Sequence, residues 1–335
     1  MRILVTGGAG FIGSHTIVEL YKAGYDPVIV DNFSNSEKFI LERLKDITGK
    51  KTPCYNVDFA NSVEVEKIIS EEKIQGVIHF AALKAVGDST KQPLNYYHNN
   101  VIGTIKLLEV LLKNNISNFV FSSSCTVYGE PDEIPVKETT KRKPATSPYG
   151  NTKMMCEDIL RDTVAAQLPI KAISLRYFNP IGAHESGLIG ELPRGLPSNL
   201  VPFITQTSIG IRKELTVFGD DYNTPDGSCI RDFIHVVDLA KAHVSALNFL
   251  KEKTDKSLYD VFNIGTGRGY SVLELIRTFE ETCKKVCKYS IGKRREGDIE
   301  CIYGNVEKAN DILNWKAEKT IKEALLDSWR WQCNL

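Results

Sequence analysis

The chain has 335 residues, and its 42 Lys and Arg are balanced by 42 Asp and Glu, so the formal net charge at pH 7 is zero. Hydrophobic residues make up 42% of the chain, which favours a large buried core and argues against a disordered protein. The neutral balance also argues against a nucleic-acid-binding protein, because such proteins carry a basic excess that neutralises phosphates. The length predicts about two domains, at roughly 150 residues each.

The eight cysteines form neither a dense framework nor a zinc-binding set, so we expect reduced thiols and no metal site. The N-terminal sequence MRILVTGGAG lacks the long apolar stretch of a signal peptide. No window approaches the roughly 18 apolar residues of a membrane span. These features predict a cytoplasmic protein that does not contact a membrane.

Short β-branched runs alternate with amphipathic stretches through the first half of the chain. We expect strands at 3–6, 27–30, 54–57, 77–80, 119–122 and 172–175, and helices near 11–23, 37–46, 61–72, 93–114 and 149–167. Continuously apolar strands that alternate with helices form a parallel sheet covered on both faces. The predicted fold is therefore a doubly wound, Rossmann-like α/β fold.

The pattern changes after residue 177. Gly and Pro accumulate over 179–202, which predicts a long irregular loop. Beyond it we expect isolated elements of a smaller lobe: strands at 215–218 and 261–264, and helices near 236–251, 271–285 and 320–331. We therefore expect a cofactor-binding domain over 1–177 and a substrate-binding lobe over 178–335, with segments near 219–245 returning to the first domain.

Three glycines follow the first predicted strand. Gly7 and Gly10 lie between the strand at 3–6 and the helix near 11–23, and Gly13 lies in the first turn of that helix. Glycine at these positions permits a tight turn, lets the backbone approach a pyrophosphate and allows the helix to pack closely on the strand. The strand-turn-helix context makes this a much stronger dinucleotide signal than the glycines alone.

The second predicted strand ends at Asp31, 18 residues after Gly13. A carboxylate at this position accepts hydrogen bonds from ribose hydroxyls and repels a 2′-phosphate, which favours NAD over NADP. Alternatively, Asp31 only begins the turn 31–36. Asp58 ends the third strand, where it could accept from an adenine amino group or cap the helix near 61–72.

Tyr149 and Lys153 are spaced i and i+4 on one face of a predicted helix. A tyrosine phenol has an ordinary pKa of about 10, and a nearby ammonium favours the phenolate. Ser124 follows the fifth strand at the sheet edge where ligands of open α/β sheets bind, so its hydroxyl and the phenol could meet there. The three residues are the candidate catalytic group.

These motifs resemble those of the extended short-chain dehydrogenase/reductase family, and longer segments resemble its UDP-glucose 4-epimerases along nearly the whole chain. The matching segments are 6–15, 31–36, 79–87, 176–180, 231–236 and 294–298. The resemblance implies a tightly held NAD that is regenerated in each cycle. In the implied reaction, Tyr149 removes the proton of the sugar 4-hydroxyl while hydride passes from C4 to NAD. The 4-keto sugar then turns over and receives the hydride on its opposite face.

The resemblance also assigns roles to individual residues. Ser124 would hydrogen-bond O4, while Lys153 would hold the nicotinamide ribose and lower the pKa of Tyr149. The implied NAD contacts are Gly7, Gly10, Phe11, Ile12, Gly13, Asp31, Asn32, Ser34, Asn35, Ser36, Asp58, Phe59, Phe80, Ala81, Ala82, Lys84, Asn99, Ser124, Tyr149, Lys153 and Phe178. The implied UDP-sugar contacts are Lys84, Ser124, Tyr149, Asn179, Asn199, Leu200, Val217, Phe218, Arg231, Arg295, Asp298 and Ile302.

Two further expectations come from the resemblance. The helices near 93–114 and 149–167 are similar to the pair that forms a homodimer interface in this family. Ile302 occupies a position where a bulky Tyr restricts the space at the sugar C2 substituent. The smaller Ile302 raises the hypothesis that N-acetylated UDP-hexosamines are also substrates, although it could equally just pack the lobe.

Other functions remain open at this point. Sugar-nucleotide dehydratases share the Tyr-x-x-x-Lys pair. After the fifth strand, however, the resemblance implies a Thr-Asp-Glu run in the dehydratases, where this chain reads Ser124-Cys125-Thr126. Sugar-nucleotide decarboxylases are a weaker alternative, because the segment around Arg231 fits the epimerases better. A non-catalytic NAD-binding regulator is the least favoured alternative, because a fold alone does not dictate activity and the catalytic candidates are all present.

Overall fold

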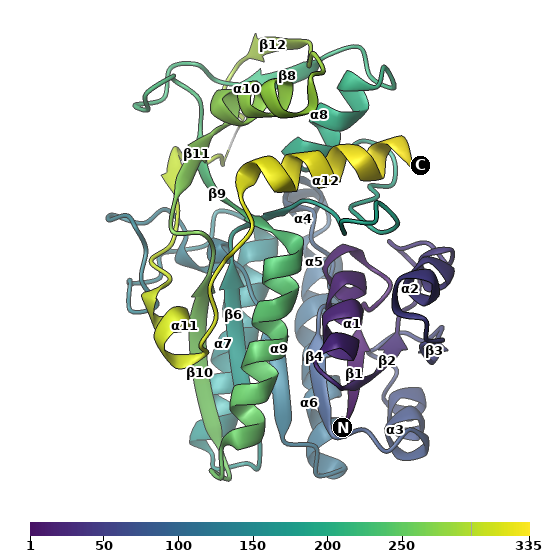
Figure 1. Cartoon of the computed structure of the whole chain (residues 1–335). Coiled ribbons are helices and arrows are strands. Elements are labelled where there is room, and N and C mark those ends of the chain that lie inside the picture. Colours follow the sequence, from purple (N-terminus) through teal and green to yellow (C-terminus); the bar gives the residue numbers. More distant parts are fainter. Residues whose placement is uncertain (296) are drawn as a thin grey trace.

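The computed structural model describes residues 1–295 and 297–335. Its centre is a seven-stranded sheet, all of whose neighbouring strands run parallel (Figure 1). The strands are β1 (Arg2–Thr6), β2 (Asp26–Val30), β3 (Cys54–Tyr55), β4 (Gly76–His79), β5 (Asn118–Ser122), β6 (Lys171–Tyr177) and β10 (Leu258–Ile264). Their order across the sheet is β10-β6-β5-β4-β1-β2-β3, which confirms the predicted doubly wound fold.

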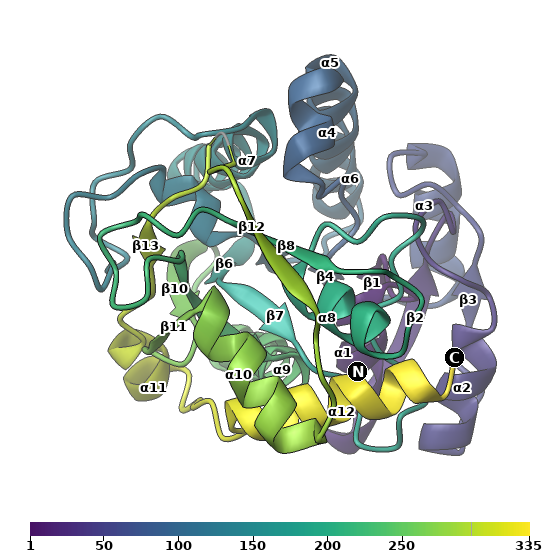
Figure 2. The same cartoon turned by 90° about the horizontal axis from the view of Figure 1, so that it is seen from above.

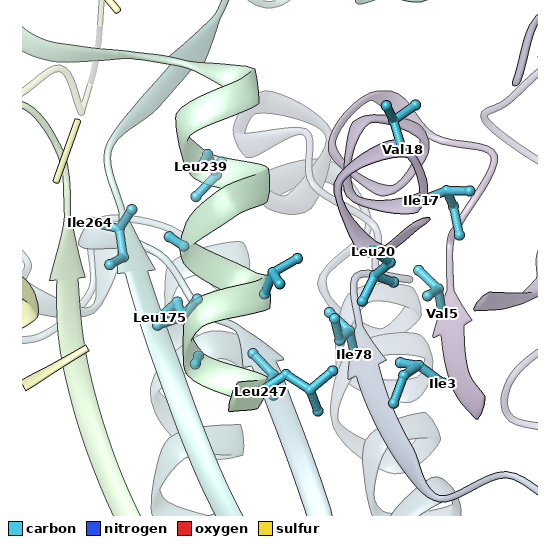
Figure 3. Packing of buried hydrophobic residues seen from close by; sticks show 14 of the residues in the cluster. Ile3, Val5, Ile17, Val18, Leu20, Ile78, Leu175, Leu239, Leu247 and Ile264 are labelled. Atoms are coloured by element: carbon cyan, nitrogen blue, oxygen red, sulfur yellow. The ribbon is translucent and has the colours of Figure 1, made fainter. Parts of the chain in front are cut away.

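Helices cover both faces of this sheet because successive strand residues point to opposite sides. In β1, Ile3 and Val5 face α1 (Phe11–Lys22), α2 (Ile40–Thr48) and α9 (Val236–Glu252), as Figure 3 shows for α1 and α9. Leu4 faces the opposite layer, which contains α3 (Ser62–Glu71), α6 (Gly103–Lys113) and α7 (Pro148–Ala165). The predicted core therefore consists of two apolar layers, one on each face of the sheet.

A second group of elements lies beyond the carboxyl ends of the large sheet (Figures 1 and 2). In it, β9 pairs with three short strands, and β8 pairs with β12. The strands are β7 (Asn179–Ile181), β8 (Leu215–Phe218), β9 (Ile230–His235), β11 (Gly269–Ser271), β12 (Tyr289–Gly292) and β13 (Cys301–Ile302). The helices of the group are α8 (Leu200–Ser208), α10 (Val272–Cys283) and α12 (Ile321–Cys333).

One strand expected in the smaller lobe lies in the large sheet instead, and the helix near 236–251, whose first part is expected to return to the first domain, packs on that sheet. The strand predicted at 261–264 is β10, which pairs with β6 from Leu258 opposite Lys171 to Ile264 opposite Tyr177. The helix predicted near 236–251 is α9, which packs on the same face as α1. Burial accounts for both positions, because residues of α9 and of β10 pack in one apolar cluster with α1 and α2.

Other boundaries also differ from the prediction. The expected helix at 93–114 is divided into α5 (Pro93–Tyr96), a π-helical turn η1 (Tyr97–Ile102) and α6. The predicted loop at 179–202 contains β7 and the start of α8, since β7 gains a ladder with β9 that no local pattern signals. Short segments between the main elements are α4 (Val86–Lys91), η2 (Cys125–Tyr128) and α11 (Glu307–Ile312). Across the described residues, the helices are too short or too polar to cross a bilayer.

Candidate active site

The glycine turn joins β1 to α1 as the sequence predicts. Gly7 has a φ of +70°, and a Cβ placed there would lie 2.9 Å from the Ala81 backbone nitrogen. A Cβ at Gly13 would lie 2.2 Å from the Gly7 carbonyl oxygen, so any side chain would push α1 away from the turn. No side chain caps the start of α1 at Gly10. The turn therefore presents a helix N-terminus to solvent, as a pyrophosphate site requires.

Asp31 fastens the turn after β2 to the glycine turn. Its carboxylate accepts from the Ala9 backbone N–H at 3.0 Å, from the Phe33 N–H at 2.9 Å and from the Ser36 hydroxyl at 2.9 Å. The turn-forming role is thus present, and a carboxylate with about four acceptor sites can still accept from a ribose. The residues at this end of the sheet fit a dinucleotide.

Asp58 does not cap α3. That role belongs to Asn61, whose side chain accepts from the Glu64 N–H at 3.3 Å. Asp58 instead accepts from the Asn32 side-chain amide at 3.1 Å, which ties the turns after β2 and β3 together. Phe59 is 5% exposed and packs in the apolar layer with α3 and α6, so its ring lies in the core.

Asn100 is a supporting residue that the sequence analysis missed. It is 2% exposed, its side chain exchanges hydrogen bonds of 2.9 and 3.0 Å with the Leu83 backbone, and it donates to the Thr152 hydroxyl at 3.1 Å. It therefore connects the segment after β4, which contains Phe80 to Lys84, to the helix that carries Tyr149. Asn100 lies among several polar residues of the helix predicted at 93–114, so no sequence signal singles it out.

The start of α7 positions the catalytic candidates. Ser147 caps the helix by accepting from the Gly150 N–H at 3.2 Å, and Pro148 occupies its first turn. Tyr149 and Lys153 then lie one turn apart and are 8% and 3% exposed. Lys153 Nζ donates to the Ser122 carbonyl oxygen at 2.6 Å and lies 6.0 Å from the centre of the Tyr149 ring. Ser124 follows Ser122 at the end of β5, so the structure brings the three predicted residues together.

Burial dominates the ionisation of this group. It raises the pKa of the Tyr149 phenol well above its ordinary value, and the nearby Ser124 hydroxyl only partly opposes this. Burial also lowers the pKa of Lys153 to about 8. In the protein without bound ligands, burial therefore outweighs the lowering of the Tyr149 pKa that we expect from Lys153. An additional positive charge beside the ring would favour the phenolate.

Glu157 and Arg176 support the serine run from behind. Ser123 donates to Glu157 Oε1 at 2.6 Å, and Arg176 reaches both Glu157 oxygens, with its shortest distance at 2.6 Å. The side chains of the ion pair are 6% and 2% exposed. Glu157 lies one turn beyond Lys153 on α7, so it is a further positioning residue. The sequence gives no signal for this role, because its partners Ser123 and Arg176 lie on other elements.

The predicted diphosphate anchors come together in the smaller lobe. Arg295 donates to the Asp298 carboxylate at 3.1 and 2.6 Å, and Arg231 on β9 lies 3.7 Å from the same carboxylate. The Arg295 guanidinium lies 5.6 Å from the centre of the ring of Phe218, which ends β8 and is 43% exposed. The carboxylate holds two guanidinium groups side by side, which suits an anionic ligand.

The remaining predicted substrate residues are divided between the site and the core. Asn199 precedes α8 and donates to Glu191 Oε1 at 2.6 Å, and Lys84 Nζ lies 3.2 Å from the same oxygen. Val217 is 1% exposed and packs inside the smaller lobe. Ile302 is 3% exposed and packs in a cluster that includes Cys125 and Phe178. Asn179 and Leu200 begin β7 and α8.

Within the part of the chain that the structure describes, the ionisable and thiol residues show no arrangement suited to a metal. In residues 1–295 and 297–335, no group of three His, Cys, Asp or Glu side chains could hold a metal ion. The eight cysteines, all of which lie in these ranges, are free thiols.

Comparisons with known proteins agree with this geometry. Residues 3–265 match the model of the NAD dependent epimerase/dehydratase family. A UDP-glucose 4-epimerase of Dictyostelium discoideum is 50% identical over 331 residues, which cover 99% of this chain and 95% of that protein. A Stenotrophomonas maltophila UDP-glucose 4-epimerase with bound NAD and formylated UDP-arabinopyranose has a TM-score of 0.96 at 45% identity, covering 100% of this chain and 98% of that one. The Bifidobacterium longum enzyme with NAD⁺ and UDP has a TM-score of 0.95 at 48% identity and the same coverage. The chain therefore belongs to the NAD dependent epimerase/dehydratase family, in agreement with the resemblance in its sequence.

Proposed function

We propose that this chain catalyses the reversible C4 epimerisation of UDP-glucose and UDP-galactose with bound NAD. The observation that carries the proposal is that Tyr149 and Lys153 lie buried on one helix face, with Lys153 bound to the end of the strand that leads to Ser124. Full-length similarity to UDP-glucose 4-epimerases supports the same activity.

The cofactor end of the site is formed by the glycine turn and by the turns after β2, β3 and β4. When bound, NAD supplies the acceptor and donor of the hydride at the sugar C4. The backbone N–H groups at the start of α1 would bind its pyrophosphate, and Asp31 would accept from its adenosine ribose. Lys153 would hold the second ribose, within reach of the carbonyl that it already contacts.

Tyr149 is the proposed base for the sugar 4-hydroxyl. Its burial keeps water away from the phenol and holds it in one place, with the Ser124 hydroxyl nearby. Ser124 would carry the proton between O4 and the phenol, and the Lys153 ammonium would stabilise the phenolate once it forms. The returning proton follows the same path in reverse, so the residues end each cycle in their starting state.

The UDP end of the site must hold its ligand firmly while the 4-keto sugar rotates. Arg231 and Arg295, fixed by Asp298, are the proposed diphosphate contacts, with Asn179 and Asn199 as further anchors. Planar guanidinium groups match phosphate oxygens in a bidentate manner. Binding energy concentrated on UDP leaves the sugar ring free to present either face.

Dehydration is disfavoured by the residues next to Ser124. Cys125 occupies a position where the resemblance implies a carboxylic acid side chain in the dehydratases. Burial raises the pKa of its thiol to about 12, so it supplies neither an acid nor a base near neutral pH. The chain thus lacks the acid/base pair that elimination of water requires.

Two narrower proposals accompany the activity. Ile302 packs beside Cys125 and Phe178, so its modest size is proposed to admit N-acetylated UDP-hexosamines as well. A homodimer is proposed through the helices of 93–113 and α7, which carry exposed apolar side chains. These are Leu94 at 82%, Ile102 at 42%, Ile105 at 36% and Met155 at 39% exposure. The proposed location is the cytoplasm.

The test uses Tyr149→Phe, which removes one oxygen atom from the site. We expect this variant to retain bound NAD and to lose UDP-galactose epimerisation by a factor of about 10² to 10⁴. Purified protein is incubated with UDP-galactose without added NAD, and the products and the NAD released on denaturation are identified. Full activity in the variant would refute the proposed mechanism.

A further inference from the structure

Residues 191–199, here called the strap, run from the loop after β7 to the start of α8. Figure 2 shows this segment passing close to the end of β2. The strap is fastened to the smaller lobe at several points: the Trp331 indole donates to the Glu191 carbonyl oxygen at 2.9 Å, and Arg212 Nη2 donates to the Gly195 carbonyl oxygen at 3.0 Å. The strap is therefore anchored to the substrate side of the molecule.

Arg194 connects this strap to the opposite side. Its guanidinium donates to the Ser34 carbonyl oxygen at 2.6 Å, to the Ser36 carbonyl oxygen at 2.8 Å and to Glu37 Oε1 at 2.9 Å. All three acceptors belong to residues 31–37, here called the cofactor loop. One planar side chain thus closes the cofactor loop against the strap, using the fork geometry that distinguishes Arg from Lys.

The cofactor loop is the segment that contains the proposed ribose contact. Within it, the Ser36 hydroxyl donates to Asp31 Oδ1 at 2.9 Å, so Arg194 acts on Asp31 through the same residue whose carbonyl it binds. A shift of Ser36 would move a hydrogen bond of the carboxylate that also holds the Ala9 N–H. The position of Arg194 therefore bears on the adenosine end of the cofactor site.

The other end of the strap lies in the proposed UDP site. Glu191 Oε1 accepts from Asn199 at 2.6 Å and lies 3.2 Å from Lys84 Nζ. Asn199 is a proposed UDP contact, and Lys84 is proposed to contact both ligands. A ligand that orders Asn199 would therefore order the strap, and through Arg194 the cofactor loop.

We propose that Arg194 is a positioning residue that joins the two nucleotide sites, so that it slows the release of NAD and lets bound UDP slow that release further. This rests on the proposed function, because it takes the cofactor loop and Asn199 as parts of the NAD and UDP sites. The side chains of Arg194 and Glu37 are half-exposed. The combined loss of the three hydrogen bonds of Arg194 corresponds to a roughly tenfold faster release of NAD. To the extent that UDP tightens the equilibrium binding of NAD, NAD tightens the binding of UDP by the same factor.

The experiment compares full-length NAD-loaded wild type with Arg194→Gln, Arg194→Lys and a matched control, Arg277→Gln. Arg277 is also an exposed arginine in an ion pair, 3.0 Å from Asp226, but it lies on α10 in the smaller lobe. Each protein is mixed with excess isotopically labelled NAD, with or without saturating UDP. The unlabelled NAD that remains bound is measured by mass spectrometry over time. This reads cofactor release directly, without reference to turnover.

We expect Arg194→Gln to release NAD roughly tenfold faster than wild type, with Arg194→Lys between them and Arg277→Gln equal to wild type. UDP should slow release from wild type and have little effect on release from Arg194→Gln. Wild-type release rates in Arg194→Gln, or an equal effect of UDP on both proteins, would overturn the proposal. If Arg194→Gln does not fold, Arg194→Lys gives the same test with a smaller expected change. Wild type that binds no NAD at all would instead contradict the proposed function.

Discussion

The Lys153 ammonium donates to the Ser122 carbonyl oxygen at 2.6 Å, two residues before the catalytic candidate Ser124. This contact joins α7 to the end of β5, the two elements that carry the proposed acid/base residues. Lys153 is 3% exposed, and burial lowers its pKa to about 8. One side chain thus fixes the position of the serine run and places a titratable charge beside Tyr149.

Replacement of Lys153 by Met, which keeps much of its length, should lower kcat by a factor of about 10² to 10⁴. The phenolate of Tyr149 would lose its stabilising charge, and burial alone would hold the phenol protonated. In wild type the same reasoning predicts that activity falls as the pH rises through about 8, where Lys153 loses its proton. Initial rates of UDP-galactose conversion across pH test both statements. A variant with wild-type rates would contradict the assignment.

The same pKa shift predicts a pH effect on stability. The folded pKa of about 8 lies below the ordinary value of 10.5, so between these values the unfolded chain binds more protons than the folded one. The contribution of Lys153 to the free energy of unfolding therefore rises with pH across this window. Urea unfolding of the cofactor-free protein near both ends of the window measures it, and Lys153→Met serves as the reference that lacks the group. An equal pH slope in both proteins would exclude the effect.

Glu157→Ala should destabilise the fold strongly. It removes the partner of Arg176 and of the Ser123 hydroxyl, and it leaves a buried guanidinium without its carboxylate. Loss of one member of such a pair costs about 3 to 5 kcal/mol of unfolding free energy. Glu66→Ala is the matched control, because Glu66 pairs with Lys113 on the surface, where ion pairs contribute little. Similar losses in both variants, measured by denaturant unfolding, would show that the buried pair has no special role.

The sequence predicts those parts of the site that depend on local spacing. The glycine turn, Asp31, and the Tyr149 and Lys153 pair all follow from short patterns within one strand-turn-helix unit or one helix face. Glu157 with Arg176, and Asn100 with Leu83, are contacts between segments that lie apart in the sequence. No periodicity signals such pairs, because either partner alone looks like an ordinary polar residue.

The misplaced elements have the same explanation. The strand of Leu258–Ile264 is correctly expected as an element, but its expected place in the smaller lobe is wrong. The helix α9 packs on the large sheet, and its first part belongs to the segment near 219–245 that is expected to return to the first domain. The apolar patterns of these two segments indicate that both are buried, but they do not indicate which sheet each one packs against. The π-helical turn at Tyr97–Ile102 was missed because it differs from an α-helix by its hydrogen-bond register, which apolar spacing does not resolve.

Asp298→Ala should weaken the binding of UDP-sugars more than it affects the chemical step. Asp298 holds Arg295 through two hydrogen bonds and lies 3.7 Å from Arg231, so its removal frees both proposed diphosphate contacts. We expect KM to rise roughly tenfold while kcat changes little, as for loss of an interaction shared by the ground and transition states. Asp221→Ala is the control, because Asp221 accepts a hydrogen bond from the neighbouring Arg294 and is more exposed than Asp298. A fall in kcat at unchanged KM would place Asp298 in the chemistry instead.

Ile302 tests the proposed substrate range. It is 3% exposed on β13 and packs with Cys125, which follows Ser124, and with Phe178. Ile302→Tyr adds bulk at this position, so kcat/KM for UDP-N-acetylgalactosamine should fall at least roughly tenfold while UDP-galactose conversion is retained. Ile302→Val is the matched control, because it keeps the space open and should preserve both activities. Unfolding measurements on each variant separate a loss of fold from a loss of specificity. Undiminished conversion of the acetylated sugar by Ile302→Tyr would leave Ile302 as a packing residue alone.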